Sequence, residues 1–139
     1  MAVRRMISIN IVNSDVFLSL PKGAQALYCH LLLRADDDGF VNNPRMIMRL
    51  VRSTERDLTQ LLDEGFLIPF ENGVVAITHW RIHNLIRKNR YIPTPYQELL
   101  AAMVIKPNGE YAKRPVPAED GPGTAMVQPT DRQRTAQVR

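Results

Sequence analysis

Three arginines stand close together in the middle of the chain, in a stretch without acidic residues. Arg45, Arg49 and Arg52 follow one another at spacings of four and three residues. No Asp or Glu occurs between Gly39 and Glu55. On a helix this spacing places the three guanidinium groups on one side. Guanidinium groups bind phosphates well, so the pattern predicts contacts with the backbone of a nucleic acid.

A second polar group follows on what we expect to be the next helix. Arg56, Thr59 and Gln60 remain outside its apolar stripe, together with Asp63. Side chains of these types hydrogen-bond to base edges and to phosphates, which predicts a helix that reads a DNA groove. A solvated polar face has the same composition. The two-helix context and the adjoining arginines favour recognition of DNA.

The most basic stretch of the chain lies between His79 and Tyr91. It contains no acid, and Trp80 and Tyr91 are interleaved with its charges. Its four Arg and Lys residues are Arg81, Arg87, Lys88 and Arg90. Such a segment is expected to follow a phosphate backbone and to add affinity without sequence discrimination. The alternative is a solvated run of charge.

Two further clusters have the residue types of metal sites without the required spacing. His79 and His83 would share one face of a helix, but Cys29 and His30 are the only other Cys and His residues, and their side chains diverge on a helix. The run Asp36–Asp38 lacks the alternating acids of a calcium loop and predicts a turn with solvated carboxylates. No catalytic Ser, His and Asp order, phosphate loop or dinucleotide fingerprint occurs. We therefore expect no catalytic residue, metal or cofactor, and a protein that is not an enzyme.

The period of the apolar residues predicts the elements that carry these side chains. Pro21 begins a helix that ends near Arg34. Its buried stripe is predicted to contain Ala24, Leu27, Tyr28, Leu31 and Leu32. Ser14 is expected to cap a short turn before it, and a short strand is expected at residues 40–42.

Two short helices are expected after this strand. Asn43 caps the first of them, with Pro44 at its first position, and Ser53 or Thr54 caps the second, which ends at Gly65. The apolar face of the first helix is predicted to contain Ile47, Leu50 and Val51. The apolar face of the second is predicted to contain Leu58, Leu61 and Leu62. Two such helices joined by a tight turn form a helix-turn-helix.

A β-hairpin is predicted around Asn72 and Gly73. This dipeptide stands between two apolar runs, and both residues accept the positive φ of a type I′ turn. The resulting register places four side chains on one buried face: Ile68, Phe70, Val75 and Ile77. Pro69 cannot donate to a ladder, which puts the first hairpin strand at the sheet edge and the second beside the strand at Phe40. Asn72 would then lie at the tip of a wing, within reach of DNA.

The order of elements predicts a known type of fold. Ile7, Ile9 and Ile11 alternate with polar residues, which predicts a half-buried strand or an extended N-terminal arm. The arm is followed by a helix, a short strand, two helices and a hairpin. This is the order of a winged helix-turn-helix, an α+β fold.

Length and composition limit the chain to one principal domain. It has 139 residues, 45% of them hydrophobic, and a net charge of +4, which suits a polyanionic partner. Cys29 is the single cysteine, so no internal disulfide is expected. The residues around Arg4 and Arg5 do not form a signal peptide, and no stretch is long enough to span a membrane. These features predict a cytoplasmic protein.

The composition changes at Pro107. Residues 107–139 contain five of the ten prolines and three of the seven glycines, and no Leu, Ile, Phe or Trp. Such a segment cannot bury enough apolar surface to offset the entropy of ordering it. We therefore expect a winged-helix domain at residues 1–106 and a disordered polar tail at residues 107–139.

Three separate blocks of sequence carry a family resemblance. They are Arg5–Val12, Arg34–Pro44 and His79–Asn84, the last continued by Ile86–Tyr91. Together they resemble the N-terminal domain of replisome organisers from phages and mobile elements of Gram-positive bacteria, relatives of DnaD-type primosome proteins. The resemblance covers residues 4–111. It implies a winged-helix module that binds DNA when replication starts, without catalytic residues. It does not extend to the second helical domain, implicated in DNA and helicase-loader contacts, into which such proteins often continue.

Three functions are compatible with these observations. The first is a double-stranded DNA-binding protein of replication initiation in the bacterial cytoplasm, with a helicase loader or another primosome protein as a further partner. A transcriptional regulator would use the same helices and wing, usually as a homodimer. A protein-interaction module would instead add a strand to a partner through Ile7, Ile9 and Ile11, without binding DNA. No membrane partner is expected.

Overall fold

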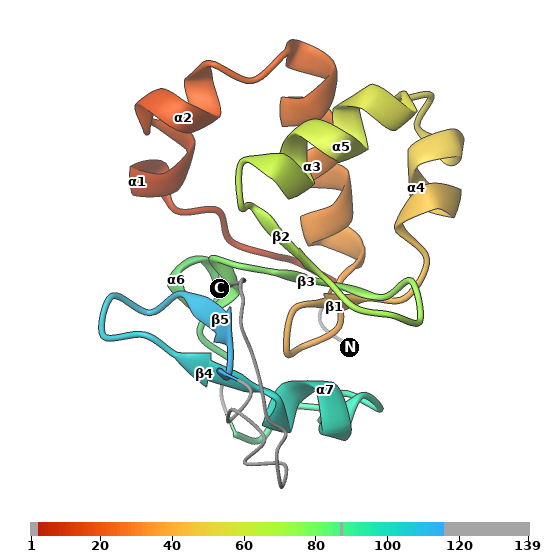
Figure 1. Cartoon of the computed structure of the whole chain (residues 1–139). Coiled ribbons are helices and arrows are strands. Elements are labelled where there is room, and N and C mark those ends of the chain that lie inside the picture. Colours follow the sequence, from red (N-terminus) through yellow and green to blue (C-terminus); the bar gives the residue numbers. More distant parts are fainter. Residues whose placement is uncertain (1–2, 87, 116–139) are drawn as a thin grey trace, which may run out of the picture.

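The long helix α3 (Lys22–Arg34) lies at the centre of the fold. The computed structural model describes residues 3–86 and 88–115, which form a mixed α+β structure with seven helices and two small antiparallel sheets (Figure 1). All five residues of the predicted α3 stripe are buried, which confirms the helical period. Gly23 allows α5 (Glu55–Asp63) to approach closely, because a β-carbon at this position would lie 2.6 Å from a carboxylate oxygen of Asp57.

Two short helices, α1 (Ile9–Val12) and α2 (Asp15–Leu18), precede α3. Ser14 caps α2 as predicted, since its hydroxyl accepts a hydrogen bond from the N–H of Phe17 (3.3 Å). Ile9 is largely exposed.

The predicted strand or arm through Ile7, Ile9 and Ile11 is therefore wrong from Ile9 onward. Alternation of isoleucines favoured an extended chain, but the backbone turns into α1, where Asn13 N–H donates to the carbonyl of Ile9 (2.9 Å). Of the predicted arm, residues 3–8 are without regular structure. This segment is held by His83 of α6 (Trp80–His83) and by Asn84 after it, whose side chains accept the N–H groups of Ser8 and Met6.

The expected helix pair is formed by α4 (Pro44–Leu50) and α5. Thr54 caps α5 in a capping box, in which its hydroxyl and the carboxylate of Asp57 each accept a backbone hydrogen bond. Leu58 and Leu61 are buried as predicted. Leu50 is 69% exposed, contrary to the prediction. The face of α4 that packs on the core passes instead through Ile47, Met48 and the half-buried Val51.

The turn between α4 and α5 contains a strained residue. Arg52 has a φ of 63° and is the one non-glycine residue with a positive φ in the described part of the chain. Its N–H donates to the carbonyl of Arg49 (3.2 Å), and Ser53 N–H donates to the carbonyl of Met48 (2.9 Å), which makes a Schellman motif. Helix α5 ends in the same motif with Gly65, at a φ of 81°, in the corresponding position. A β-carbon makes this conformation cost roughly 1–2 kcal/mol.

Strands β1 (Phe40–Val41), β2 (Leu67–Pro69) and β3 (Val75–Ile77) form an antiparallel sheet in the order β1-β3-β2. Pro69 therefore lies on an edge strand and β3 lies beside β1, as the sequence predicted. All three residues of β3 are buried, because other parts of the chain cover both faces of the sheet.

The predicted hairpin register is wrong by one residue. Ile68 lies opposite Ala76, and Phe70 closes the loop by donating its N–H to the carbonyl of Val74 (2.9 Å). Gly73 has a φ of 84°, but the asparagine before it does not have a positive φ. The loop is thus one residue longer than a type I′ turn, with its glycine in the left-handed region. The four side chains predicted to share one face are consequently divided between the two faces.

The residues after β3 form a lower layer, which lies on the side of the sheet opposite to α3 and α5 (Figure 1). It consists of α6, α7 (Gln97–Ala101), β4 (Met103–Ile105) and β5 (Tyr111–Lys113). The predicted domain boundary at residue 106 is wrong, because it falls inside the β4–β5 hairpin. Tyr111 is 3% exposed, and its hydroxyl donates to the carbonyl of Asp38 (2.9 Å). The rest of the predicted tail, residues 116–139, lies outside the described residues.

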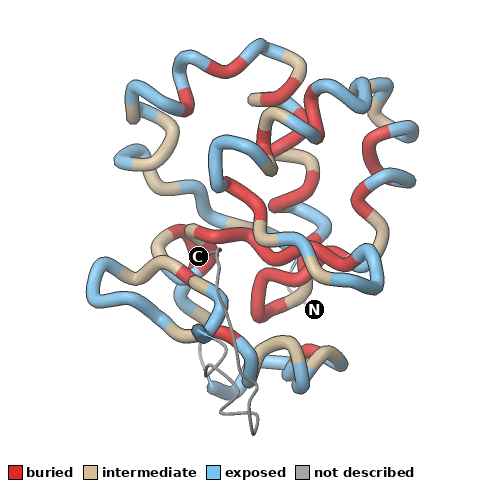
Figure 2. Tube along the Cα trace, in the orientation of Figure 1, coloured by how far each residue is buried: buried red, intermediate tan, exposed pale blue. Residues whose placement is uncertain are grey.

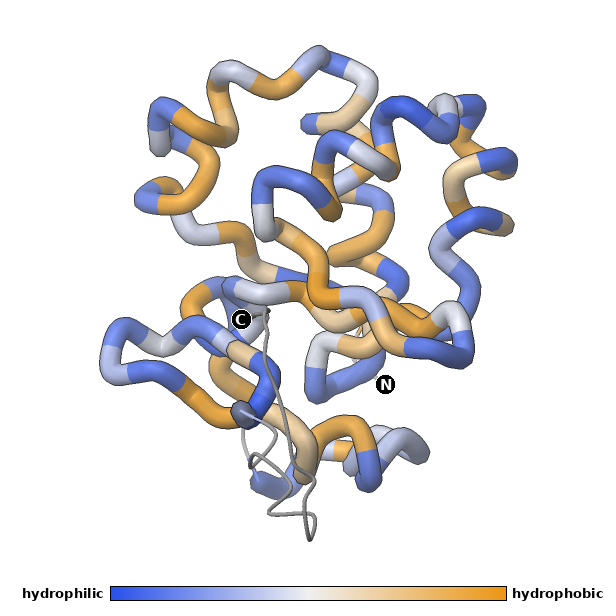
Figure 3. The backbone as a smooth tube through the Cα atoms, in the orientation of Figure 1, coloured by the Kyte–Doolittle hydropathy of each residue, from blue (hydrophilic) through white to orange (hydrophobic). Residues whose placement is uncertain are grey.

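The core lies on both sides of the sheet (Figure 2). Between the sheet and the upper helices, Phe17, Tyr28 and Phe66 make mutual edge-to-face contacts with ring centroids 5.4–5.6 Å apart. On the other face, Phe40 packs against Phe70 and Tyr96 at 6.0 and 5.9 Å. Hydrophobic residues are concentrated along the same buried segments, among them the strands of the sheet (Figure 3). The helices and the lower layer are thus held in one piece through the sheet.

Candidate nucleic-acid interface

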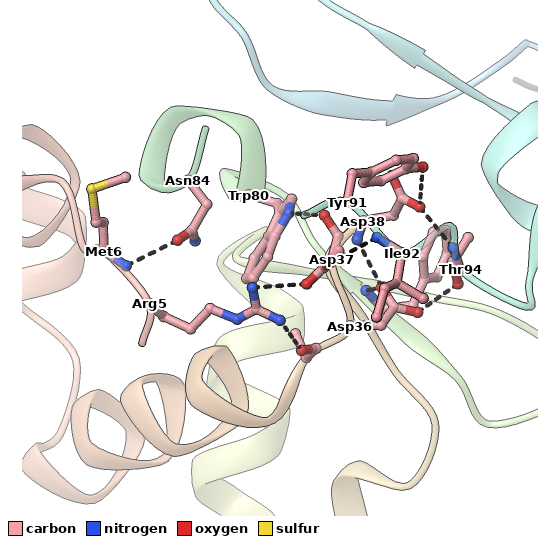
Figure 4. A network of polar contacts seen from close by, with 12 residues as sticks. Arg5, Met6, Asp36, Asp37, Asp38, Trp80, Asn84, Tyr91, Ile92 and Thr94 are labelled. Carbon is pink, nitrogen blue, oxygen red and sulfur yellow. Dashed lines mark hydrogen bonds and ion pairs between the residues drawn. The ribbon is translucent and has the colours of Figure 1, made fainter. Parts of the chain in front are cut away.

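The run Asp36–Asp38, at the end of α3, forms a buried polar centre (Figure 4). Asp37 and Asp38 are 5% and 6% exposed. The carboxylate of Asp36 accepts hydrogen bonds from the N–H groups of Asp38 and Phe40 (both 3.0 Å) and thereby closes the turn before β1. The predicted turn is confirmed, but its carboxylates are not solvated, because segments far away in the sequence supply partners for all three acids.

Asp37 holds the segment before α1 through a buried ion pair. Nη1 of Arg5 lies 3.0 Å from Oδ1 of Asp37, and the two side chains are 1% and 0% exposed. The guanidinium group also donates to the carbonyl of Ala35 (2.7 Å) and lies 4.9 Å from the ring centroid of Trp80. The indole N–H of Trp80 in turn donates to the carbonyl of Asp37 (2.9 Å). Arg5 is therefore part of the folded core and not of a binding surface.

Asp38 holds the segment that follows α6. Its carboxylate accepts the hydroxyl of Tyr91 (2.7 and 2.9 Å) and the N–H of Thr94 (2.9 Å). Desolvation of the phenol, together with the hydrogen bond and the charge of Asp38, raises the pKa of Tyr91 to about 12. The phenol therefore stays a protonated donor at neutral pH, and the ring of Tyr91 is fixed in position.

His83 connects α6 to α3 and to the segment before α1. Its Nδ1 accepts the N–H of Ser8 (2.8 Å), and its Nε2 lies 2.6 Å from the hydroxyl of Tyr28. Because Nδ1 accepts, the neutral ring carries its proton on Nε2 and donates it to Tyr28. Burial, with a smaller effect from His79, lowers the pKa of His83 to about 4. Within residues 3–86 and 88–115, no group of three or more His, Cys, Asp and Glu side chains is arranged to hold a metal ion.

The arginines of α4 and of the turn after it lie at the surface. Arg45 forms an ion pair with Glu55 (2.7 Å), with both side chains 56% exposed. Arg49 is exposed near the end of α4, and Arg52 lies beyond that end. The prediction that all three share one side of one helix is therefore wrong, because α4 ends at Leu50. An exposed pair such as Arg45–Glu55 contributes little to stability, so Arg45 can exchange its partner for a phosphate.

The next helix presents part of its predicted recognition face to solvent. Arg56 and Thr59 are exposed. Gln60 is half-buried and lines a groove of about 230 Å³ between α2 and α5, together with Asp15 and Glu64. The exposed side of α5 thus carries Arg56 beside Glu55 near its beginning and the acids Asp63 and Glu64 at its end.

Asn72 lies exposed in the hairpin loop, as predicted. Its Oδ1 accepts the N–H of Val74 (3.2 Å), which stabilises the loop. Because that oxygen is engaged, the group that the side chain offers to a ligand is its Nδ2 amide donor.

The predicted basic segment is divided between α6 and the chain after it. Arg81 is exposed on α6, and Lys88 and Arg90 are exposed beyond it. Arg87 lies outside the described residues. Two neighbouring clefts are lined by these exposed residues, and three residues missing from the predicted site line them as well: Arg4, Leu85 and Tyr91. The charge of Arg4 and the aromatic Tyr91 beside basic residues were the available sequence signals.

Two separate basic surfaces result from this arrangement. The α4–α5 surface consists of Arg45, Arg49, Arg52, Arg56 and Thr59. The α6 surface consists of Arg4, Arg81, Lys88 and Arg90. Figure 1 shows the β2–β3 loop and α6 at opposite ends of β3. The basic segment therefore does not extend the wing, because the chain first crosses the sheet before that segment begins.

Comparisons with known proteins add no assignment to these surfaces. No known protein family, curated protein or solved structure matches this chain. The resemblance to replisome organisers therefore stays a prediction that rests on the three blocks of sequence. In the part of the chain that the structure describes, no helix is long and apolar enough to cross a membrane.

Proposed function

We propose that this chain binds double-stranded DNA through a winged helix-turn-helix, with α5 in the major groove. The element order α3, β1, α4, α5, β2 and β3 supports the proposal, because a helix pair followed by a hairpin is the arrangement of winged-helix modules. The sheet order β1-β3-β2 supports it as well, since the hairpin pairs with the short strand that precedes the helix pair.

The exposed charge around the α4–α5 turn carries the proposal. Arg49, Arg52 and Arg56 are all exposed there, and Arg45 is held only by an exposed ion pair. The positive end of the α5 dipole adds to this field. In the proposed complex Arg45, Arg49 and Arg52 contact phosphates, whereas Arg56 and Thr59 face base edges, and the loop with Asn72 contacts the neighbouring backbone.

The resemblance favours the start of replication of a phage or mobile element as the process, with a helicase loader as a further partner. A transcriptional regulator with the same module is the second candidate, and it would bind as a homodimer to a two-fold site. Strand addition through Ile7, Ile9 and Ile11 has less support, because Ile9–Val12 is helical and offers no extended edge.

A binding titration tests the proposal. The full chain is titrated with a random duplex and with duplexes from its own genomic neighbourhood, each at two salt concentrations. Combined replacement of Arg49 and Arg52 by Gln should weaken binding to every duplex and lower the salt slope by about 0.9 for each phosphate that is no longer neutralised. Arg56→Ala should lower the ratio of specific to random binding, by about 1–3 kcal/mol if the arginine binds its base in a bidentate manner.

Arg34→Gln is the matched control. Arg34 is also an exposed arginine at a helix end, but among the described residues its side chain bonds to His30 of its own helix alone. Its replacement should leave DNA binding unchanged. Unchanged affinity of the α4–α5 variants for every duplex, with a native circular dichroism spectrum, would contradict the proposal.

A further inference from the structure

Two clefts flank the segment 84–86. One of about 320 Å³ is lined by Arg81 and Lys88, and the other, of about 380 Å³, is lined by Arg4 and Arg90. Asn84, Leu85 and Ile86 line both. The lining acids are Asp37 and Asp38, and their carboxylates are buried and bonded within the protein. The charge that the two clefts offer to a ligand is therefore positive.

The cleft lined by Arg81 and Lys88 also contains an exposed aromatic side chain. Tyr91 is 38% exposed, although its hydroxyl is anchored to the buried carboxylate of Asp38. The anchored ring loses little conformational freedom when a ligand stacks on it. Leu85, which is 85% exposed, adds apolar surface to the same cleft. Such a surface is suited to the flat face of an unpaired base.

The wall shared by the two clefts includes an unsatisfied donor. Asn84 is 8% exposed, and its Oδ1 accepts the N–H of Met6 (2.9 Å). Its Nδ2 has no hydrogen-bond partner among the described residues. A buried amide without a partner is unfavourable, but its nitrogen has almost no accessible surface, so ligand binding is expected to rest on the cations and the aromatic ring.

We propose that the α6 surface binds a single strand of nucleic acid, at a site separate from the duplex-binding α4–α5 surface. Cations at the rim contact phosphates, and the ring of Tyr91 stacks on an unpaired base. A duplex would use the cations alone, because its bases are stacked inside the helix and cannot enter a cleft. An acidic peptide would also use only the cations.

This site does not depend on the proposed duplex binding. It lies at the opposite end of β3 from the β2–β3 loop (Figure 1), so either activity can be lost while the other remains. A protein with both sites would bind best where duplex DNA adjoins an unpaired strand.

The test is fluorescence anisotropy of the full chain with a labelled oligothymidylate of about 16 nucleotides, which cannot pair with itself. Combined replacement of Lys88 and Arg90 by Gln changes two exposed side chains and should lower the salt slope by about 0.7 for each phosphate that is no longer neutralised. Tyr91→Ala should weaken binding about fivefold or more, whereas Tyr91→Phe, which keeps the ring but loses its hydrogen bond to Asp38, should lose clearly less. Arg49→Gln should leave the single-strand affinity unchanged.

Three results would overturn the proposal. The first is an unchanged oligothymidylate affinity after the double replacement of Lys88 and Arg90. The second is an equal loss in Arg49→Gln, which would indicate one shared surface. The third is competition by polyglutamate as effective as that by unlabelled oligothymidylate, with Tyr91→Ala unaffected, which would indicate an acidic protein partner. Failure of duplex binding alone would leave the single-strand site standing.

Discussion

The buried Arg5–Asp37 pair gives a quantitative test of what holds the segment before α1. In Arg5→Met the apolar stem of the side chain is largely kept, but the guanidinium group is removed. The carboxylate of Asp37, which is 0% exposed, then retains the N–H of Ile92 (3.0 Å) as its partner outside the turn. Removing one member of a buried pair costs about 3–5 kcal/mol. For a domain whose total stability is about 5–15 kcal/mol, this is a large fraction.

A double-mutant cycle separates the ion pair from the packing of the arginine. Asp37→Asn removes the charge and keeps an oxygen for Ile92. The double variant of Arg5→Met and Asp37→Asn leaves no buried charge unpaired, so it should be more stable than the sum of the single changes implies. We expect a coupling of about 2 kcal/mol or more between the two positions.

Urea denaturation measures these changes with two probes. Far-ultraviolet circular dichroism reports the whole fold. The fluorescence of Trp80, the single tryptophan, reports the pair directly, because the guanidinium group lies over its ring. Arg45→Met is the matched control, since it breaks an exposed pair and should cost at most about 1 kcal/mol. A destabilisation by Arg5→Met no larger than by this control, or single changes that add without coupling, would refute the reasoning.

Three further predictions concern a turn, a histidine and the second sheet. Arg52→Gly should raise the free energy of unfolding by at most about 1 kcal/mol, because it removes a β-carbon from a left-handed position but makes the unfolded chain more flexible. Gly65→Ala should lower the free energy of unfolding by a similar amount. A destabilised Arg52→Gly or a stabilised Gly65→Ala in denaturant titrations would contradict this. The pKa of His83 is lowered to about 4 from an ordinary value near 6.5, so the unfolded chain binds the extra proton between these values. Its contribution, about 3 kcal/mol, is fully present above pH 6.5 and is lost as the pH falls toward 4, and His83→Gln should flatten the measured slope of stability against pH in that window. Tyr111→Ala should cost about 3 kcal/mol in thermal unfolding, and Tyr111→Phe about 1 kcal/mol; no change in either would support the predicted domain boundary at residue 106.

Elements with a strong local signal could be predicted from the sequence. The stripe of α3 repeats at helical spacing, the beginning and end of α5 are marked by Thr54 and Gly65, and Pro69 excludes a central strand. Each of these features acts through sterics or hydrogen bonds within a few residues, so a linear pattern is sufficient to reveal it.

Features that depend on packing could not be predicted in this way. A three-residue hairpin loop in place of a two-residue loop moves every side chain of β2 to the other face of the sheet. Such a shift would normally expose apolar side chains to water, but here both faces of the sheet are covered, so it does not. For the same reason the alternation of Ile7, Ile9 and Ile11 did not produce a strand, because no sheet edge in the described part of the chain receives it.

The candidate site shows the same division. The sequence by itself determined which residues carry positive charge and that Arg45, Arg49 and Arg52 stand near a helix-turn-helix. Only the tertiary structure decided that Asp37 and Asp38 are buried and that Arg5 is paired in the core. It also decided that the basic residues form two surfaces, since β3 carries the chain across the sheet between them. Electrostatic partnership depends on distance in space, and residues far apart in the sequence become neighbours only when the chain has folded.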